Sequence, residues 1–223
     1  MSGEAILAID GPAGAGKSTV ARRCANALGV EMLDTGAMYR AVTLAVLRSG
    51  GAIDDAVACT AVAEGSVIDL VDGVTRLDGE DVSVAIRSPE VTSTVSAVSA
   101  HRGVRAALVA HQRRWSQAHG RGVVEGRDIG SVVFPDARCK IYLDATPRER
   151  AERRRRDELA AGRDVDIEAL VVDIERRDAL DSNRAESPLV RARDAIVFDT
   201  SGRTIDDIVE HIVERYRDAN GVS

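Results

Sequence analysis

The chain has 223 residues, a length that fits one α/β domain with room for an insertion, and because only 3% of them are aromatic its core must be largely aliphatic. The formal net charge of −6 disfavours generic binding to nucleic acid or to a membrane surface. The three cysteines are widely spaced, which indicates neither a zinc site nor a disulfide framework, and the first apolar run is too short for a signal peptide, so we expect a cytoplasmic protein.

Five short apolar runs predict the strands of one sheet, at residues 5–10, 30–33, 122–126, 140–145 and 195–200. Their apolar character is continuous, which is typical of strands buried on both faces. Helical stretches separate them, at residues 17–28, 37–48, 104–118, 147–161, 167–181 and 204–217. Thr146 is the expected cap of the helix that begins at Pro147. This alternation predicts an α/β fold in which helices flank a parallel sheet.

One segment, at about residues 51–100, interrupts the alternation. It contains two Asp-Gly pairs, Asp72-Gly73 and Asp78-Gly79, between short apolar runs. Such pairs are typical of two-residue hairpin turns, and helix-like pieces flank them. We therefore expect an inserted subdomain with short antiparallel strands.

The stretch "GPAGAGKS", residues 11–18, lies between the first predicted strand and the first predicted helix and fits G-x-x-x-x-G-K-[ST]. Glycines allow successive backbone N–H groups to point at a phosphate, and the helix directs its positive end toward the same place. Lys17 is expected to reach the β and γ phosphates, and the Ser18 hydroxyl to ligate Mg²⁺. The residues expected to bind ATP are Gly11, Pro12, Ala13, Gly14, Ala15, Gly16, Lys17, Ser18 and Thr19.

Other features narrow the class of nucleotide-binding protein. The guanine-reading pattern N-K-x-D is missing from the sequence, which argues against a switch GTPase. A motor-type ATPase would be expected to carry Asp or Asp-Glu at the end of an apolar strand to polarise water. Asp144 ends a predicted strand, but no Glu follows it. A kinase is the class that fits best. A regulatory protein that senses or hydrolyses nucleotide without an acceptor is the alternative from a different class.

A kinase must also bind an acceptor and exclude water from it. Polar clusters follow the predicted strands, where ligands bind in parallel sheets, at Asp34–Arg40 and at Arg127–Asp128. A third cluster, Arg177–Arg184, lies near the end of a predicted helix. Two interpretations of it stay open, because the spacing of Arg177 and Asp181 also fits a surface helix pair.

The arginine-rich run Arg148–Arg156 has two interpretations as well. It fits a solvated helix face, and it also fits a mobile hairpin that closes over the phosphates of ATP. The single tryptophan and the histidines show no partner pattern for catalysis or metal binding, so we expect packing or surface roles for Trp115, His101, His111, His119 and His211.

The motifs "IDGPAGAGKST", "LDTGAMYR", "GEDVS" with "IRSPEV", "VVEGRDIGSVVFPDA", "KIYLDA" and "ERRDALDSNRAESPL" together resemble the bacterial cytidylate kinases over nearly the whole chain. The resemblance implies a single P-loop kinase domain over residues 1–223 with a five-stranded parallel core. It also implies a nucleoside monophosphate (NMP)-binding insert at about 51–100 and an Arg-rich lid at about 148–166. The implied reaction is transfer of the γ-phosphoryl group of ATP to CMP or dCMP with Mg²⁺.

The same resemblance implies roles for the polar clusters. Arg40 and Arg127 would hold the CMP phosphate, with Thr35 nearby. Arg177 and Asp181 would engage the ribose. Phosphoryl transfer between two phosphates needs charge neutralisation more than a strong base, so no catalytic base is named.

Ser96, Arg105 and Asp128 would read the cytosine. A carboxylate at Asp128 accepts a hydrogen bond from the exocyclic amine of cytosine but repels the carbonyl that uracil carries there. Arg184 would approach the transferring phosphates, and with Lys17 and Arg127 it completes the expected catalytic set.

The nearest alternative is another small-molecule or nucleoside monophosphate kinase, against which the insert and the GRD segment argue. The expected partners are the small-molecule substrates ATP and CMP or dCMP, with no nucleic acid and no membrane. We expect a monomer.

Overall fold

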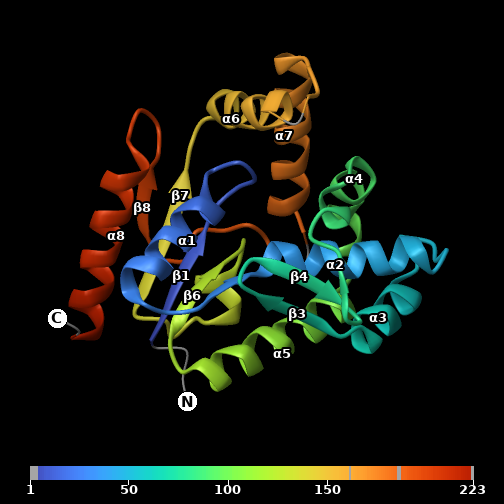
Figure 1. Cartoon of the computed structure of the whole chain (residues 1–223), viewed down its shortest axis with the longest axis horizontal. Coiled ribbons are helices and arrows are strands. Elements are labelled where there is room, and N and C mark those ends of the chain that lie inside the picture. Colours follow the sequence, from blue (N-terminus) through green and yellow to red (C-terminus); the bar gives the residue numbers. More distant parts are fainter. Residues whose placement is uncertain (1–4, 161, 185–186, 222–223) are drawn as a thin grey trace. The chain divides into compact units, whose positions relative to one another are not determined.

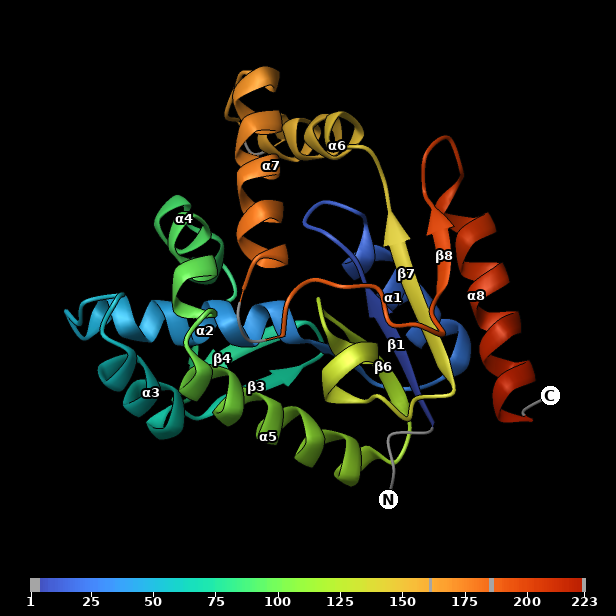
Figure 2. The same cartoon turned by 180° about the vertical axis from the view of Figure 1, so that it is seen from behind.

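Five strands form one sheet in the computed structural model, in the order β2-β6-β1-β7-β8 (Figures 1 and 2). The central strand β1 (Ile6–Asp10) pairs in parallel with β6 (Gly122–Glu125) and with β7 (Cys139–Asp144). Strand β8 (Ile196–Asp199) pairs in parallel with β7, and β2 (Met32–Asp34) lies at the other edge. All five predicted strands and the parallel sheet are therefore confirmed.

The structure describes residues 5–160, 162–184 and 187–221, and these fall into two units. The first unit comprises the described residues up to Met32 and from His119 onward, and it contains most of the sheet. The second unit is Leu33–Ala118.

Four helices belong to the first unit: α1 (Lys17–Leu28), α6 (Pro147–Ala160), α7 (Ile167–Ser182) and α8 (Ile205–Asn220). They agree with the predicted ranges, except that the predicted last residue of α6, Ala161, lies outside the described residues.

The start of α6 is a capping box, which confirms the predicted cap. The Thr146 Oγ1 accepts a hydrogen bond from the Glu149 amide (3.3 Å), and the Glu149 Oε2 accepts one from the Thr146 amide (3.1 Å).

The aliphatic core of the first unit lies between the sheet and two helices. Buried residues of β1, β6 and β7 pack against α1 through Val20, Ala21 and Cys24, and against α8 through Ile208 and Ile212. A π-helical turn, η3 (Ile129–Val133), follows β6 and lies against β1. The sequence does not signal this turn, because one irregular turn carries no periodic pattern.

One expectation about the sheet is wrong. The apolar run of β8 predicts a strand buried on both faces, but Ile196 is 40% exposed and Val197 is 42% exposed. The reason is its position, since β8 is an edge strand and pairs with β7 on one side only in the described residues. An apolar run predicts the strand but not its place in the sheet.

The second unit is built on α2 (Thr35–Arg48), whose buried face includes Met38, Val42 and Val46. A three-stranded antiparallel sheet of order β3-β4-β5 and the further helices complete it. The remaining elements are α3 (Ala56–Gly65), β3 (Ile68–Val71), β4 (Val74–Leu77), β5 (Glu80–Asp81), η2 (Ala85–Arg87), α4 (Pro89–Val98) and α5 (Arg102–His119).

Both predicted hairpin turns are confirmed. Asp72-Gly73 joins β3 to β4 with φ of 51° and 78°, and Asp78-Gly79 joins β4 to β5 with φ of 51° and 86°. Positive φ at both residues is the geometry that a tight hairpin requires.

The predicted insert at about 51–100 falls within the second unit, which extends beyond it at both ends. That this segment binds a nucleotide, and that residues 148–166 act as a lid, stay predictions. Among the described residues, no helix is both long enough and apolar enough to cross a membrane.

The turn geometry makes a prediction for stability. Gly73→Ala forces a side chain into the left-handed region at φ 78°, and because no atom of the described residues lies within 4 Å of the new Cβ, backbone strain decides the effect. We expect a loss of about 1–2 kcal/mol in the free energy of unfolding, measured by urea denaturation. The control is Gly65→Ala at the end of α3, where the space is equally open and φ lies outside the left-handed region. Equal effects of the two substitutions would contradict the prediction.

Candidate functional site

The loop between β1 and α1 has the backbone of a phosphate cradle. Its glycines Gly11, Gly14 and Gly16 have φ of 148°, 79° and 88°, which residues with side chains rarely adopt. Gly11 is also required by space, because a Cβ there would lie 2.1 Å from the Leu143 carbonyl oxygen of β7. Helix α1 begins at Lys17, directly after this loop. The loop thus lies at the positive end of a helix.

The side chains of the loop that are predicted to bind ligands differ in burial. Lys17 is only 6% exposed, and its Nζ donates a hydrogen bond to the Pro12 carbonyl at 2.9 Å, across the loop. Ser18 and Thr19 are exposed at the start of α1. The nine residues predicted to bind ATP therefore occupy the loop after β1 and the start of α1.

Asp10, the last residue of β1, connects the loop to the segment after β6. Its carboxylate accepts hydrogen bonds from the amides of Ile129 and Gly130, both at 2.8 Å. Burial raises its pKa to about 6, although the two amides partly offset this. Asp10 is not among the residues predicted from the sequence. The available signal was an acid that ends a buried apolar run directly before the first loop glycine.

Asp128, which lies in the segment that Asp10 anchors, is also buried, with 4% exposed. It directly precedes η3, and its carbonyl accepts hydrogen bonds from the Val132 and Val133 amides at 2.9 and 3.1 Å. Its negative charge contributes to the raised pKa of Asp10. Two buried carboxyl groups therefore lie near each other in the segments after β1 and β6.

Three arginines surround Asp181 of α7. The Arg127 Nε donates to the Asp181 Oδ2 at 3.1 Å. The Arg184 Nε donates to the Asp181 carbonyl at 3.2 Å, and its Nη1 lies 3.9 Å from the Asp181 Oδ1. Arg127 and Asp181 belong to two different predicted clusters, and the structure brings them into contact.

Arg177, one turn before Asp181, is 7% exposed, so the surface-pair interpretation of these two residues is wrong. Among the described residues its Nε has no hydrogen-bond partner, and burial together with the nearby charges of Arg127 and Arg154 lowers its pKa. Guanidinium groups form charge-assisted, often bidentate hydrogen bonds with phosphate, so this cluster of arginines is chemically suited to an anion such as a phosphate.

The four predicted residues of the second unit occupy three helices. On α2, Thr35 is buried in the first turn, and the Arg40 Nη1 donates to the Thr92 Oγ1 at 2.9 Å. On α5, Arg105 is 4% exposed and its guanidinium lies over the Tyr39 ring, 5.4 Å from the ring centre. Ser96 is half-buried on α4. Thr92 was missed, since a threonine in an amphipathic helix carries no distinguishing pattern.

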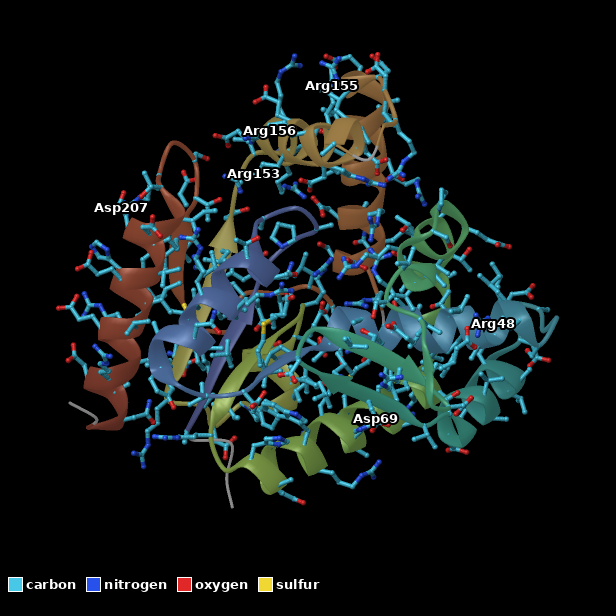
Figure 3. The ribbon with its side chains drawn as sticks, viewed as in Figure 1. Arg48, Asp69, Arg153, Arg155, Arg156 and Asp207 are labelled. Carbon is cyan, nitrogen blue, oxygen red and sulfur yellow. The ribbon has the colours of Figure 1, made fainter. Side chains whose placement is uncertain are left out.

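The arginine run of α6 is not a simple solvated face (Figure 3). Arg150 is only 3% exposed, and Arg153 donates two hydrogen bonds to Thr200, at 2.9 Å to Oγ1 and 3.0 Å to the carbonyl. Other arginines of the run form ion pairs with acidic residues: Arg148 with Glu168, Arg154 with Asp173 and Arg155 with Asp164.

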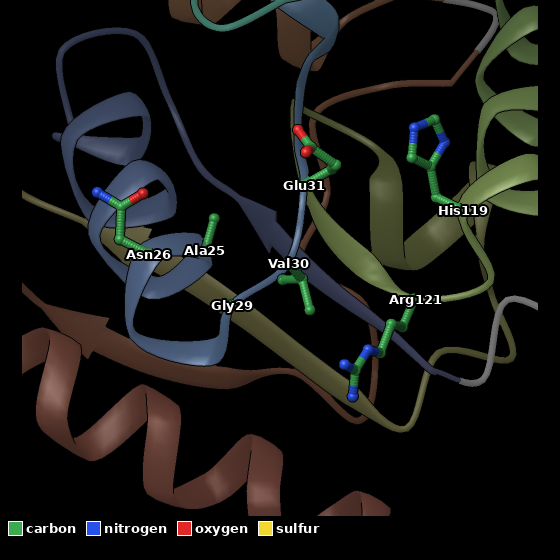
Figure 4. Close-up of a pocket in the computed structure, with 7 residues that line it drawn as sticks. All are labelled: Ala25, Asn26, Gly29, Val30, Glu31, His119 and Arg121. Atoms are coloured by element: carbon green, nitrogen blue, oxygen red, sulfur yellow. The ribbon is translucent and has the colours of Figure 1, made fainter.

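A pocket of about 440 Å³ lies at the other end of α1 from the phosphate loop (Figure 4). None of the residues that line it is predicted to bind substrate or metal or to act in catalysis. They are Ala25, Asn26, Gly29, Val30, Glu31, His119 and Arg121. The candidate site is therefore defined by the phosphate loop and the buried charges around it, not by this pocket.

Known proteins resemble this chain over nearly its whole length. The sequence profile of the family described as cytidylate kinase matches residues 7–218. A cytidylate kinase of Desulforamulus reducens is 49% identical over 96% of this chain and 97% of its own length. A cytidylate kinase of Mycobacterium avium is 48% identical over the full length of both chains. A solved structure from Eubacterium ventriosum shares the fold with a TM-score of 0.51 and 11% identity, over 96% of this chain and 98% of its own.

Asp10 supplies a prediction about pH. Its pKa of about 6 in the folded chain exceeds the ordinary value of 3.8, so the folded state binds this proton more tightly than the unfolded state. Ionisation of Asp10 should therefore lower the free energy of unfolding as the pH rises from about 4 to about 6. Carboxyl ¹³C NMR, assigned with Asp10→Asn, should give a titration midpoint near 6.

Asp194 is an internal control in the same titration, because its hydrogen bond to Lys140 holds its pKa below the usual range. A midpoint for Asp10 as low as that of Asp194 would contradict the role assigned to burial.

Proposed function

The chain belongs to the cytidylate kinase family, and we propose that it transfers the γ-phosphoryl group of ATP to CMP, and also to dCMP, giving ADP and the corresponding diphosphate. The observation that carries this proposal is a complete phosphate loop in a chain that matches this family over residues 7–218. We further propose that the protein acts as a monomer in the cytoplasm.

The proposed donor site is the loop from Gly11 to Thr19. The positive φ of its glycines lets the backbone N–H groups surround a phosphate. Lys17 would exchange its hydrogen bond with the Pro12 carbonyl for the β and γ phosphates of ATP. Its burial near the start of α1 keeps this charge close to the place where the phosphates would bind.

Mg²⁺ fits the exposed hydroxyl of Ser18, the second residue of α1, because a hydroxyl oxygen is a suitable ligand for this hard cation. When bound with ATP, the ion would neutralise negative charge on the phosphate oxygens. Ser18 is therefore our proposed metal ligand from the protein.

The proposed role of Arg127, Arg177 and Arg184 is to bind and neutralise phosphate and to position the substrate. The three guanidinium groups share Asp181 as a nearby counter-charge. The CMP phosphate is itself ionised near neutral pH, so it needs no general base. We assign Arg127 to the CMP phosphate, Arg177 and Asp181 to the ribose, and Arg184 to the transferring phosphates.

Asp128 is our proposed reader of the base. Its carboxylate would accept a hydrogen bond from the exocyclic amine of cytosine and face a repulsive carbonyl in uracil. Burial strengthens this discrimination, because a wrong base would leave a polar group unpaired away from water. From the second unit, we assign Ser96 and Arg105 to the base, and Thr35 and Arg40 to the CMP phosphate.

The activity is tested with an acceptor panel. We expect ATP consumption in a coupled assay to depend on the added acceptor, with CMP and dCMP well above UMP, AMP and GMP. Lys17→Ala should abolish turnover while the melting temperature stays close to that of the wild type. Consumption of ATP that does not change when CMP is added would instead favour a nucleotide hydrolase. Turnover of UMP as fast as CMP would refute the base assignment.

Asp128→Asn tests the base reader directly. Its amide donates to a carbonyl, so the ratio of kcat/KM for CMP to that for UMP should fall by at least about tenfold. The matched control is Asp181→Asn, which changes a proposed ribose contact and should lower kcat/KM for both substrates by the same factor. An unchanged ratio in Asp128→Asn, with the protein folded, would show that another group reads the base.

A further inference from the structure

The carbonyl groups of the phosphate loop need partners of their own. A loop that turns its N–H groups toward a phosphate turns carbonyls away from it. In this structure the Pro12 carbonyl accepts from the Lys17 Nζ at 2.9 Å, and the Ala13 carbonyl accepts from the Arg150 Nη1 at 3.0 Å. Lys17 would leave its carbonyl when ATP binds. Arg150 would not need to, because it holds the loop from the side of α6.

Arg150 joins three separate segments through one planar group. Besides the Ala13 carbonyl, its Nε donates to the Ala145 carbonyl at 3.0 Å, at the end of β7, and its Nη2 donates to the Asp178 Oδ2 at 2.5 Å. The three bonds fix both the position and the plane of the guanidinium. Gly14 lies against the same residue, since a Cβ on Gly14 would lie 3.1 Å from the Arg150 Cβ.

We propose that Arg150 of α6 and Asp178 of α7 are positioning residues that fix the phosphate loop through the Ala13 carbonyl. Helix α7 is also the helix that carries Arg177 and Asp181. Three loop glycines leave the backbone many alternative conformations, and holding one carbonyl removes part of that freedom before ATP arrives. The proposal rests on the proposed function, because it assumes that the loop binds the donor nucleotide.

Packing of α6 on α7 does not by itself require this arrangement. The two helices already meet through an apolar contact of Ala151 with Leu170 and Ile174. They are also joined at the surface by the ion pair of Arg148 with Glu168, in which both side chains are more than half exposed. A buried guanidinium is a costly way to pack helices when an apolar side chain of similar volume would serve. An apolar side chain could not form the three directed hydrogen bonds that Arg150 makes.

The test compares two conservative variants. Arg150→Lys keeps the charge but cannot bond to three acceptors in one plane, and Asp178→Asn keeps the shape of the carboxylate but loses its charge. Binding of ADP with MgCl₂, measured by calorimetry, should weaken about tenfold in Arg150→Lys and less in Asp178→Asn. Without nucleotide, amide hydrogen exchange in residues 11–16 should be faster in both variants, and binding of CMP should change less than binding of ADP.

The control variant is Ile174→Val, which loosens the apolar contact of α6 with α7 and leaves the Arg150 hydrogen bonds in place. Its affinity for ADP should stay within about twofold of the wild type. If Arg150→Lys does not fold, Asp178→Asn decides the question alone.

Two results would overturn the proposal. The first is that both variants fold and bind ADP as the wild type does, with unchanged amide hydrogen exchange in the loop. The other is a loss of ADP affinity in Ile174→Val that equals the loss in Arg150→Lys, because the effect would then come from helix packing. A wild-type protein that does not bind ADP at all would instead refute the proposed function, and this inference with it.

Discussion

The whole site depends on how closely the chain after β1 passes the end of β7. The position of a Cβ on Gly11 lies 2.1 Å from the Leu143 carbonyl oxygen, so only a glycine allows β1 to continue into the loop. That close passage is possible because β1 is the central strand, with β6 and β7 paired in parallel on its two sides. The carboxyl ends of these three strands then supply Asp10, the segment of Arg127 and Asp128, and the Ala145 carbonyl. One steric constraint therefore brings the parts of the first unit's site to one edge of the sheet.

The first unit gathers several arginines in one place although the chain as a whole is acidic. The sequence has a formal net charge of −6, yet Arg127, Arg177 and Arg184 gather around Asp181. Clustered guanidinium groups are chemically suited to an anion such as a phosphate. The proposed phosphate sites would thus have positive charge locally, while the acidic chain as a whole disfavours general binding of polyanions. The arrangement also suits a reaction in which neutralising charge matters more than moving a proton.

Helix α7 links this arginine cluster to the phosphate loop. Two adjacent residues of this helix have different neighbours. Arg177 lies in the arginine cluster, whereas Asp178 accepts a hydrogen bond from Arg150. Arg150 in turn reaches the Ala13 carbonyl. The arginine-rich run of α6 thus contains side chains with different tasks. Arg150 is buried and tied to the loop, Arg153 is held by Thr200, and Arg148 forms an exposed ion pair.

The sequence by itself determined the features that depend on local backbone chemistry. The glycine spacing of the phosphate loop, the Asp-Gly hairpin turns and the five apolar runs each predict a conformation that neighbouring residues enforce. It also marked Arg127, Asp128 and Asp181 by their positions after strands and on a late helix. Only the tertiary structure decided which of these residues meet. Arg127 finds Asp181 across 54 residues, Arg150 finds Ala13 across 137, and β8 is exposed because it is an edge strand. Such contacts depend on how α6, α7 and the strands pack, and no pattern within a short stretch of sequence records that packing.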